Sequence, residues 1–237
     1  MHTSGYVGRL AFAIIALAGT AAADQITLTP IADARVLSIF PTLNAATDFL
    51  STYYDAAGND QRTLIQFDLS LIPAGATIDS SALRLYGLSY DSSSAPSSIS
   101  VYRVARPWVE NQVTWVNAAT GSPWTNAGGD IVGTTGGQLT QPYSVWTGNQ
   151  TPAYAWYAID VLSLTNDYFQ GVHPNYGFAL DAPFGNSLTF VSREGTAPSG
   201  ATRTEYPELV VTYTPAPEPA SACLLALGVL TLRTRRR

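Results

Sequence analysis

Aromatic side chains are the groups in this sequence best suited to bind a sugar. The flat ring of Trp or Tyr can stack on the apolar face of a pyranose ring, and the same ring can instead fill a protein core. Trp124 and Trp146 lie among Gly, Ser and Thr, which favours exposure, and Tyr53 and Tyr54 offer two further ring faces. We therefore predict that these four residues contact a glycan, with a place in the core as the alternative. Trp156 lies in a strand-like segment, which favours the core.

A second group of polar side chains crowds a short turn. Asp55, Asn59 and Asp60 surround Gly58, and several oxygen ligands on one tight loop are what a Ca²⁺ ion requires. Asp and Asn also favour turns without any metal, because their side chains hydrogen-bond to nearby backbone groups. The sequence therefore leaves two interpretations open, a structural Ca²⁺ site and an ordinary turn.

Four charged residues lie beside apolar strand positions, namely Arg62, Asp68, Arg193 and Glu194. A guanidinium group can grip a carboxylate through two parallel hydrogen bonds, so Arg62 and Arg193 could clamp an acidic sugar. The alternative pairs these two residues with Asp68 and Glu194 inside the fold. We favour this second interpretation, because charges spread so evenly along strands are typical of a structural framework.

Carboxylates that could supply the pair required for glycoside hydrolysis are Glu110, Asp160, Glu194 and Glu205. The sequence does not place two of them at the required separation, and no feature marks one as buried and protonated. His173 has no nucleophile motif near it and is expected at the surface. We therefore expect a protein that is not an enzyme, with a polysaccharide hydrolase or lyase as the less favoured alternative.

The region between the two ends of the chain has the composition of a β protein. It is rich in Ser, Thr, Gly, Pro, Tyr and Val, and turn signals recur about every ten residues. Apolar alternation predicts strands at 63–69, 82–88, 99–104, 154–161, 176–180, 188–191 and 209–213, and a short one at 131–132 within a loop over 121–137. Residues 162–170 predict one or two helical turns before Gly171. We therefore predict an all-β, jelly-roll-like antiparallel β-sandwich with one short helix.

Two of these strands show which side chains should face the core. At 82–88, Leu83 and Leu85 share one face while Arg84 and Tyr86 share the other. The strand at 63–69 places Ile65, Phe67 and Leu69 opposite Leu64, Gln66 and Asp68. Because successive side chains of a strand point to opposite faces, both patterns indicate a half-buried strand.

Residues 1–23 have the features of a secretion signal. Arg9 precedes an apolar run over 10–18, and the small residues at 21–23 suit a signal peptidase that cleaves before Asp24. The run is shorter than the roughly 20 residues that a membrane span requires. We therefore predict an exported protein, with a retained anchor as the alternative.

Residues 215–237 resemble a sorting segment. Pro217, Glu218 and Pro219 are followed by an apolar stretch over 220–232 and then by a terminal Arg cluster. This order is similar to the PEP-CTERM sorting signal of Gram-negative bacteria that make extracellular polysaccharide. The resemblance implies processing by an exosortase-type membrane enzyme, transient membrane association through the tail, and a final location at the outer surface or in the extracellular matrix. A plain C-terminal anchor is the alternative.

Charge and cysteine content disfavour several partners and sites. The twelve basic residues are all Arg, and five of them lie in the two end segments. One acidic residue, Glu218, also lies there, which leaves seven Arg against sixteen acidic residues in the central region. Such an acidic chain is a poor partner for nucleic acid and anionic lipid. The only cysteine, Cys223, lies in the tail. The domain therefore has no disulfide and no zinc site built on cysteine.

One pattern runs through most of the central region, in segments 62–78, 82–86, 101–104, 108–110, 113–115, 157–161, 175–180, 192–194 and 206–213. Together these segments resemble the DNRLRE domain, a β-sandwich of exported bacterial and archaeal proteins that is related to carbohydrate-binding modules. Asp33-Ala34-Arg35-Val36 also fits, whereas the loop that follows, through Tyr54, departs from the pattern. The resemblance implies one domain over 24–214. We therefore expect an exported, non-catalytic surface or matrix protein that binds extracellular polysaccharide, with a structural or adhesive spacer without a sugar site as the alternative.

Overall fold

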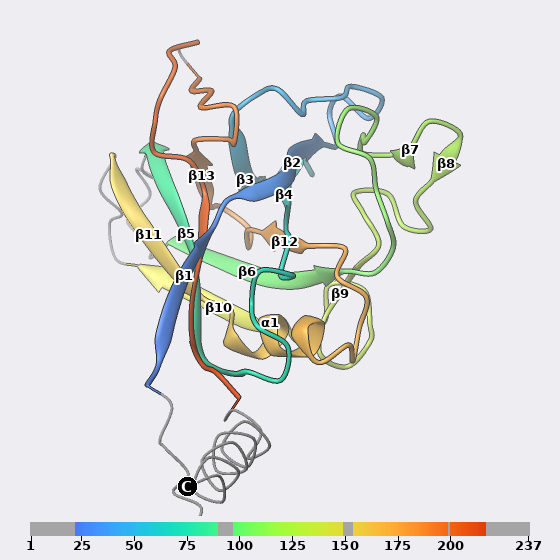
Figure 1. Ribbon diagram of the computed structural model, residues 1–237. Helices are drawn as coiled ribbons and strands as arrows, with labels where there is room; N and C mark the ends of the chain where they lie inside the picture. The colour runs from blue at the N-terminus through green and yellow to red at the C-terminus, as the bar shows by residue number, and fades with distance from the viewer. Residues whose placement is uncertain (1–21, 90–96, 149–153, 199, 217–237) are drawn as a thin grey trace, which may run out of the picture.

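The chain folds into two packed layers of antiparallel strands with one short helix, as the computed structural model shows (Figure 1). The structure describes residues 22–89, 97–148, 154–198 and 200–216. The prediction of an all-β antiparallel sandwich with one short helix is therefore confirmed. Most of the secretion signal and the sorting motif Pro217-Glu218-Pro219 lie outside the described residues, so both remain predictions.

The strands are β1 (Asp24–Leu28), β2 (Pro30–Leu37), β3 (Leu50–Tyr54), β4 (Asp60–Phe67), β5 (Thr77–Ser89), β6 (Ser97–Val104), β7 (Asn117–Ala119), β8 (Ser122–Pro123), β9 (Ile131–Val132), β10 (Ser144–Gly148), β11 (Ala155–Asp160), β12 (Phe178–Asp181), β13 (Ser187–Phe190) and β14 (Glu208–Thr214). The helix α1 spans Leu162–Phe169. All strands predicted from the sequence are present, and β1, β2, β3, β7, β8 and β10 are found in addition.

The pairing of the strands defines the two layers. In the first layer, β5 lies between β14 and β11, and β1 borders β14. In the second layer, β4 lies between β2 and β12, and β12 is followed by β6 and β10. Strand β13 pairs with β5 on one side and with β3 on the other, and β3 in turn pairs with β4. Hydrogen bonding is therefore continuous from β1 to β10, although the strands form two layers.

The main core lies between these layers and follows from the period-two alternation of the strands. Leu83 and Leu85 of β5 are fully buried, whereas Arg84 and Tyr86 remain partly exposed, as the alternation predicts. Phe178 enters the same cluster from β12 in the facing layer. Burying one apolar side chain of this size contributes about 1.5–3 kcal/mol, so this cluster provides the main driving force for folding.

A second core covers the opposite face of the β4 layer. Leu64, Tyr102 and Ala179 point away from the main core and pack beneath the long segment 105–141. Leu64 is completely buried, although the sequence predicts a half-buried strand. The reason is that a loop region supplies the second cover, and the alternation within β4 gives no sign of it.

Trp124 belongs to this second core. Its side chain is 6% exposed, and its indole N–H donates a hydrogen bond of 3.0 Å to the backbone oxygen of Thr114. The expectation of an exposed Trp124 is wrong, because the Gly- and Thr-rich segment folds back over the sheet and turns this ring inward. Its ring therefore offers no stacking face to a glycan.

The helix α1 forms where the sequence predicts it. The Asp160 carboxylate accepts the backbone N–H of Leu162 at 2.9 Å, and Gly171 follows the last turn with a φ of 70°. The buried Tyr168 anchors the helix to the main core. In the ranges that the structure describes, no helix is both long and apolar enough to cross a membrane.

Candidate functional site

Three aromatic rings gather on the outer face of β5 and β11. Trp156 and Tyr86 are cross-strand partners, and their ring centroids lie 5.4 Å apart with an interplanar angle of 73°. Trp156 is 37% exposed and Tyr154 is 64% exposed. The expectation that Trp156 fills the core is wrong, because its neighbour Tyr157 takes the inward position of β11. We refer to Tyr86, Tyr154 and Trp156 as the aromatic face.

Two guanidinium groups border the aromatic face. The Cζ atom of Arg84 lies 4.6 Å from the ring centroid of Trp156. The Cζ atom of Arg203 lies 5.3 Å from the ring of Tyr86 and 5.5 Å from that of Tyr154. Rings with hydrogen-bond donors beside them can hold a pyranose ring and bind its hydroxyl or carboxylate groups at the same time. The aromatic face therefore has the chemistry of a sugar-binding surface.

None of the residues predicted to contact a glycan belongs to the aromatic face, and Trp146, Tyr53 and Tyr54 lie on other strands. Trp146 on β10 is half-buried, and its ring packs against Tyr157 with 5.1 Å between the centroids. Tyr54 on β3 is 38% exposed and meets Phe184 edge-on at 6.0 Å. The hydroxyl of Tyr53 donates to Asp55 at 2.7 Å. Tyr54 and Phe184 thus form a second, smaller exposed pair of rings.

The turn predicted to bind Ca²⁺ is held by its own hydrogen bonds. One carboxylate oxygen of Asp55 accepts two backbone N–H groups at 2.9 Å each, and the other accepts the Tyr53 hydroxyl and the Asn59 amide. These bonds, the one from Tyr53 first, lower the pKa of Asp55 to about 2. Asp60 is paired with Arg62 instead. The structure brings Asp55 and Asn59 together but pairs Asp60 with Arg62, and hydrogen bonding explains the turn without a metal.

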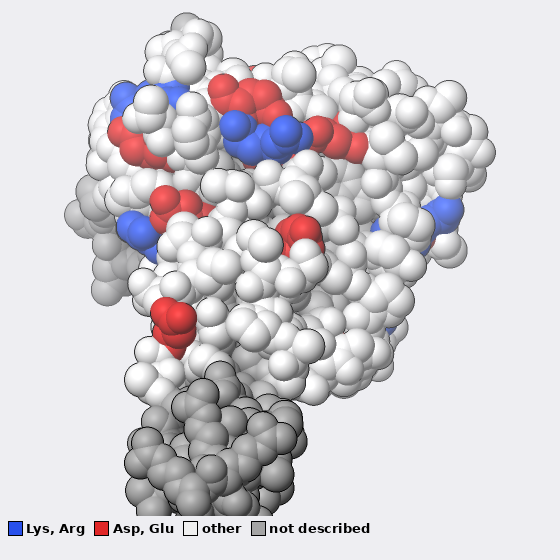
Figure 2. Space-filling model, in the orientation of Figure 1, with Lys and Arg blue, Asp and Glu red and all other residues white. Residues whose placement is uncertain are grey.

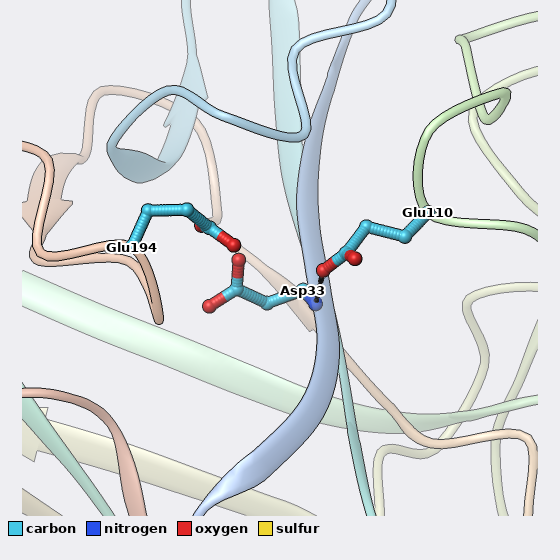
Figure 3. A group of neighbouring side chains, drawn as sticks. All are labelled: Asp33, Glu110 and Glu194. Carbon is cyan, nitrogen blue, oxygen red and sulfur yellow. Dashed lines mark hydrogen bonds between the residues drawn. The ribbon is translucent and has the colours of Figure 1, made fainter.

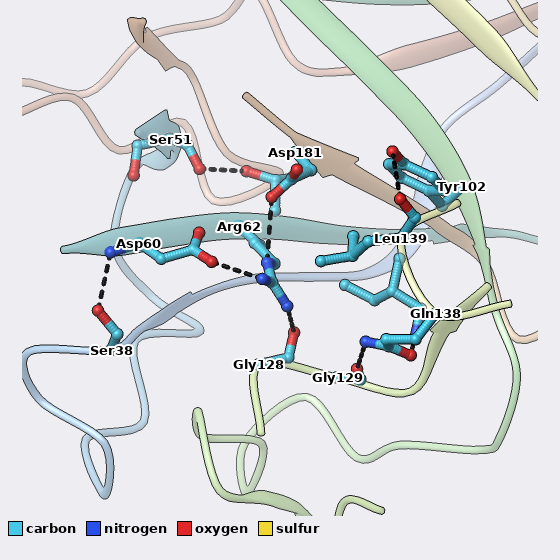
Figure 4. Close-up of polar contacts among 12 residues, drawn as sticks. Ser38, Ser51, Asp60, Arg62, Tyr102, Gly128, Gly129, Gln138, Leu139 and Asp181 are labelled. Carbon is cyan, nitrogen blue, oxygen red and sulfur yellow. Dashed lines mark hydrogen bonds and ion pairs between the residues drawn. The ribbon is translucent and has the colours of Figure 1, made fainter. Parts of the chain in front are cut away.

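Arg62 forms an internal network rather than a sugar clamp (Figure 4). Its guanidinium lies 2.5 Å from a carboxylate oxygen of Asp60 and 3.1 Å from one of Asp181. It also donates to the backbone oxygen of Gly128 at 3.2 Å. Burial raises the pKa of Asp181 to about 6, although the charge of Arg62 acts in the opposite direction. Arg62 is thus part of the framework, but it pairs with Asp60 and Asp181 and not with Asp68, which is exposed.

Three acidic side chains from distant segments meet at one place (Figure 3), and Arg193 lies beside them. Asp33 lies on β2, Glu110 in the loop after β6, and Glu194 in the loop after β13. One oxygen of each carboxylate lies within 4.8 Å of the other two. Arg193 Nη1 lies 2.8 and 2.7 Å from the two Glu110 oxygens, and its Nε lies 3.5 Å from Glu194. The sequence therefore indicates Glu194 as a neighbour of Arg193 but misses its main partner, Glu110.

Asp33 is the buried member of this acidic cluster. Asp33 has no exposed area. One of its carboxylate oxygens accepts the backbone N–H of Arg193 at 2.7 Å, and the other, Oδ1, has no hydrogen-bond partner. Burial raises the pKa of Asp33 to about 8. The side chains of Glu110 and Glu194 are 25% and 30% exposed. The acidic cluster of Asp33, Glu110 and Glu194 therefore opens to solvent on one side.

The charged side chains are sparse over the visible surface. Figure 2 shows mixed acidic and basic patches toward the upper edge of the view and a few smaller charged groups elsewhere, with a mostly uncharged surface around them. The described residues form several ion pairs, among them Arg84 with Glu208 and Arg203 with Glu205. Because these charged side chains are paired, acidic and basic groups lie next to one another on the surface.

The carboxylates considered for catalysis have different roles. Glu110 and Glu194 meet in the acidic cluster, whereas Asp160 lies at the start of α1 and Glu205 binds Arg203. Sequence reasoning missed Asp33 as a site residue, although its motif is recognisable. It also missed the aromatic face, for which the alternation of Arg84 and Tyr86 on one face of β5 was the available signal.

Comparison with known proteins gives the family. No curated protein matches the chain. The pattern described as the disaggregatase related repeat domain matches residues 42–204, which is more than half of the chain and contains β3 through β13. The aromatic face, its two Arg residues, Glu110 and Glu194 all lie within the matched region, and Asp33 precedes it. The chain therefore belongs to the disaggregatase related repeat family.

Proposed function

We propose that this protein is an exported, non-catalytic component of the cell surface or extracellular matrix, and that its sandwich binds extracellular polysaccharide through the aromatic face. The observation that supports this most directly is the exposed ring of Trp156, which packs against the half-buried Tyr86 and has Arg84 beside it. The family match and the resemblance of the sequence to the DNRLRE domain support the same class of ligand.

The chemistry of the aromatic face favours a polysaccharide with acidic or hydroxyl-rich sugars. The rings of Trp156 and Tyr154 bind the apolar faces of pyranose rings. A guanidinium group carries five N–H donors, so Arg84 can contact Glu208 and a sugar at the same time. Because Arg203 lies near two of the rings, a chain of sugars that crosses the aromatic face meets a second guanidinium group.

Affinity electrophoresis of the full-length chain through gels that contain an acidic polysaccharide such as alginate, or a neutral one such as dextran, tests this proposal. We expect retention by at least one polysaccharide and its loss in Trp156→Ala and Tyr154→Ala. Phe40→Ala is the matched control, because Phe40 is 54% exposed on a loop outside the aromatic face. Tyr54→Ala tests the second pair of rings.

Two outcomes oppose the proposal. Absence of retention by every acidic and neutral polysaccharide favours the structural or adhesive spacer instead. Loss of retention in Tyr54→Ala alone, with Trp156→Ala unchanged, assigns the binding to the pair of Tyr54 and Phe184 and not to the aromatic face.

Export and sorting form a separate part of the proposal. Residues 1–23 direct secretion, and residues 215–237 are recognised by an exosortase-type enzyme in a transient membrane-bound state. Cell fractionation of the full-length chain and of a Pro217→Ala, Glu218→Ala, Pro219→Ala variant tests it. We expect the variant to keep its tail and remain unprocessed, whereas processing identical to that of the unchanged protein contradicts the sorting role.

We further propose that the protein does not hydrolyse its ligand. Asp33 has no exposed surface with which to reach a glycosidic oxygen, and Glu110 is held by two contacts with Arg193. A reducing-end assay over the polysaccharides that bind should therefore show no release of sugar. Release that is lost in Glu110→Gln or Glu194→Gln contradicts the proposal and favours the hydrolase or lyase.

A further inference from the structure

The acidic cluster has the geometry of a cation site. Ca²⁺ binds carboxylate oxygens at about 2.3–2.6 Å, so two oxygens on one ion can lie up to about 5 Å apart. In the cluster, one oxygen from each of Asp33, Glu110 and Glu194 lies within 4.8 Å of the other two. A single ion between them therefore reaches all three carboxylates without a large movement of the backbone.

The buried carboxylate of Asp33 is a second, independent observation that points to a ligand. Its Oδ1 atom is buried and has no hydrogen-bond partner, although Oδ2 of the same carboxylate is bonded to the backbone of Arg193. Figure 3 shows one oxygen of Asp33 directed toward the carboxylate of Glu194. Because buried polar atoms are nearly always paired, this oxygen requires a bound ion, a water molecule or a proton.

The charge balance of the cluster favours a divalent ion. Three carboxylates face one guanidinium group, that of Arg193, which leaves two negative charges when all three acids are ionised. Burial of Asp33 makes this negative charge costly to maintain. A divalent ion removes this cost because it neutralises both charges where they are closest.

Access and ligand chemistry are also suitable. Glu110 and Glu194 are partly exposed, so an ion can enter from solvent and keep water molecules in its remaining positions. Arg193 contacts Glu110 and so fixes the direction of that carboxylate. Among the residues that the structure describes, this is the only place where three acidic, histidine or cysteine side chains lie close enough to share one ion. All three offer oxygen ligands, which hard cations prefer.

We propose that Asp33, Glu110 and Glu194 form a binding site for a hard divalent cation, with Ca²⁺ as the ion to be tested. The site joins β2, the loop after β6 and the loop after β13. The last of these loops continues to Arg203, whose backbone N–H donates to Gly195 at 2.7 Å beside Glu194. The ion thus stabilises the loop that leads to the aromatic face, but the proposal does not rest on glycan binding.

Isothermal titration of the full-length chain with CaCl₂, after dialysis against a chelator, tests the proposal. We expect one equivalent of Ca²⁺ to bind with a Kd of roughly 0.1–1 mM, the range of extracellular modules, and to raise the Tm. Glu194→Gln and Glu110→Gln should each weaken binding about tenfold or more, because each removes a charged ligand. Both residues are partly exposed, so these variants should fold, which circular dichroism verifies.

The matched controls are Glu205→Gln, in the same loop but outside the cluster, and Asp55→Asn in the turn near β3. Both should bind Ca²⁺ like the unchanged protein. The proposal is overturned if Ca²⁺ up to about 10 mM gives neither heat nor a shift of the Tm, since that range exceeds the expected Kd. In that case the three carboxylates of the cluster share a proton or a water molecule instead of an ion. It is equally overturned if binding survives in both Glu194→Gln and Glu110→Gln, or is lost in Asp55→Asn.

Discussion

The backbone N–H of Arg193 donates a hydrogen bond of 2.7 Å to the carboxylate of Asp33, which joins two residues 160 positions apart in the sequence. The side chain of the same Arg193 contacts Glu110, and Glu110 in turn accepts the backbone N–H of Asp33 at 2.8 Å. Three segments of the chain are therefore closed into one ring of contacts. Arg193 is also the positive charge of this ring.

Replacement of Arg193 by Ala should lower the free energy of unfolding by about 1–3 kcal/mol, because it leaves three carboxylates without a counter-charge. Arg84→Ala is the control, since Arg84 is similarly exposed but contacts the single carboxylate of Glu208. We expect this control to cost less than about 1 kcal/mol. Urea unfolding in the presence of a chelator measures both values, and equal losses contradict the role given to Arg193.

The two tryptophans Trp124 and Trp156 should respond in opposite ways. Trp124→Ala removes a buried ring from the second core and should cost about 3–5 kcal/mol of stability. Trp156→Ala alters a partly exposed ring and should cost about 1 kcal/mol. Denaturant unfolding compares them. A larger loss of stability for Trp156→Ala than for Trp124→Ala contradicts the buried position of Trp124 and the partly exposed position of Trp156.

Gly177 is required where the chain passes close to β4. Its φ is 95°, and a Cβ atom would lie 2.5 Å from the backbone oxygen of Ile65. Gly177→Ala should therefore cost more than about 2 kcal/mol, the sum of backbone strain and displaced backbone. Gly185→Ala is the control, because Gly185 has a φ of 83° but open space around its Cα and should show only about 1 kcal/mol of strain. Similar Tm values for the two variants contradict the close approach of residue 177 to β4.

Asp181 should make the protein less stable as the pH rises. Burial raises the pKa of Asp181 from 3.8 to about 6, so the folded chain holds this proton more tightly than the unfolded chain. The contribution of Asp181 to the free energy of unfolding is fully present below about pH 4 and is lost as the pH rises to about 6. The loss is roughly 2–3 kcal/mol at most.

Asp181→Asn keeps an oxygen that can accept a hydrogen bond from Arg62 but cannot titrate. Urea unfolding at pH values between 4 and 7 should therefore show a smaller fall in stability for this variant than for the unchanged protein. The same dependence on pH in both proteins contradicts the raised pKa of Asp181.

The sequence predicts strands well where one face is buried by regular structure. In β5, the alternation of Leu83 and Leu85 with Arg84 is visible in the sequence and matches the burial. In β4, Leu64 is buried by a loop region that contains little regular structure. That cover depends on the path of a Gly-rich segment, which has no periodicity, and so neither Leu64 nor Trp124 could be placed correctly.

The candidate sites were harder to predict than the fold. Trp156 and Tyr157 are adjacent aromatic residues, so alternation places them on opposite faces without showing which one points outward. The acidic cluster depends on contacts between residues that are 77 and 160 positions apart, such as Asp33 with Glu110 and with Arg193. Local pattern contains no information on such contacts, and only the arrangement of the strands brings them together.

Titration of the full-length chain with an oligosaccharide of the polysaccharide that it binds best, compared with Trp156→Ala and Phe40→Ala, is the most direct test of the aromatic face. A ring at the centre of a binding surface commonly contributes about 2 kcal/mol or more, so Trp156→Ala should raise the Kd by about thirtyfold or more. Phe40→Ala should leave the Kd within about twofold. An unchanged Kd for a folded Trp156→Ala variant contradicts glycan binding at the aromatic face.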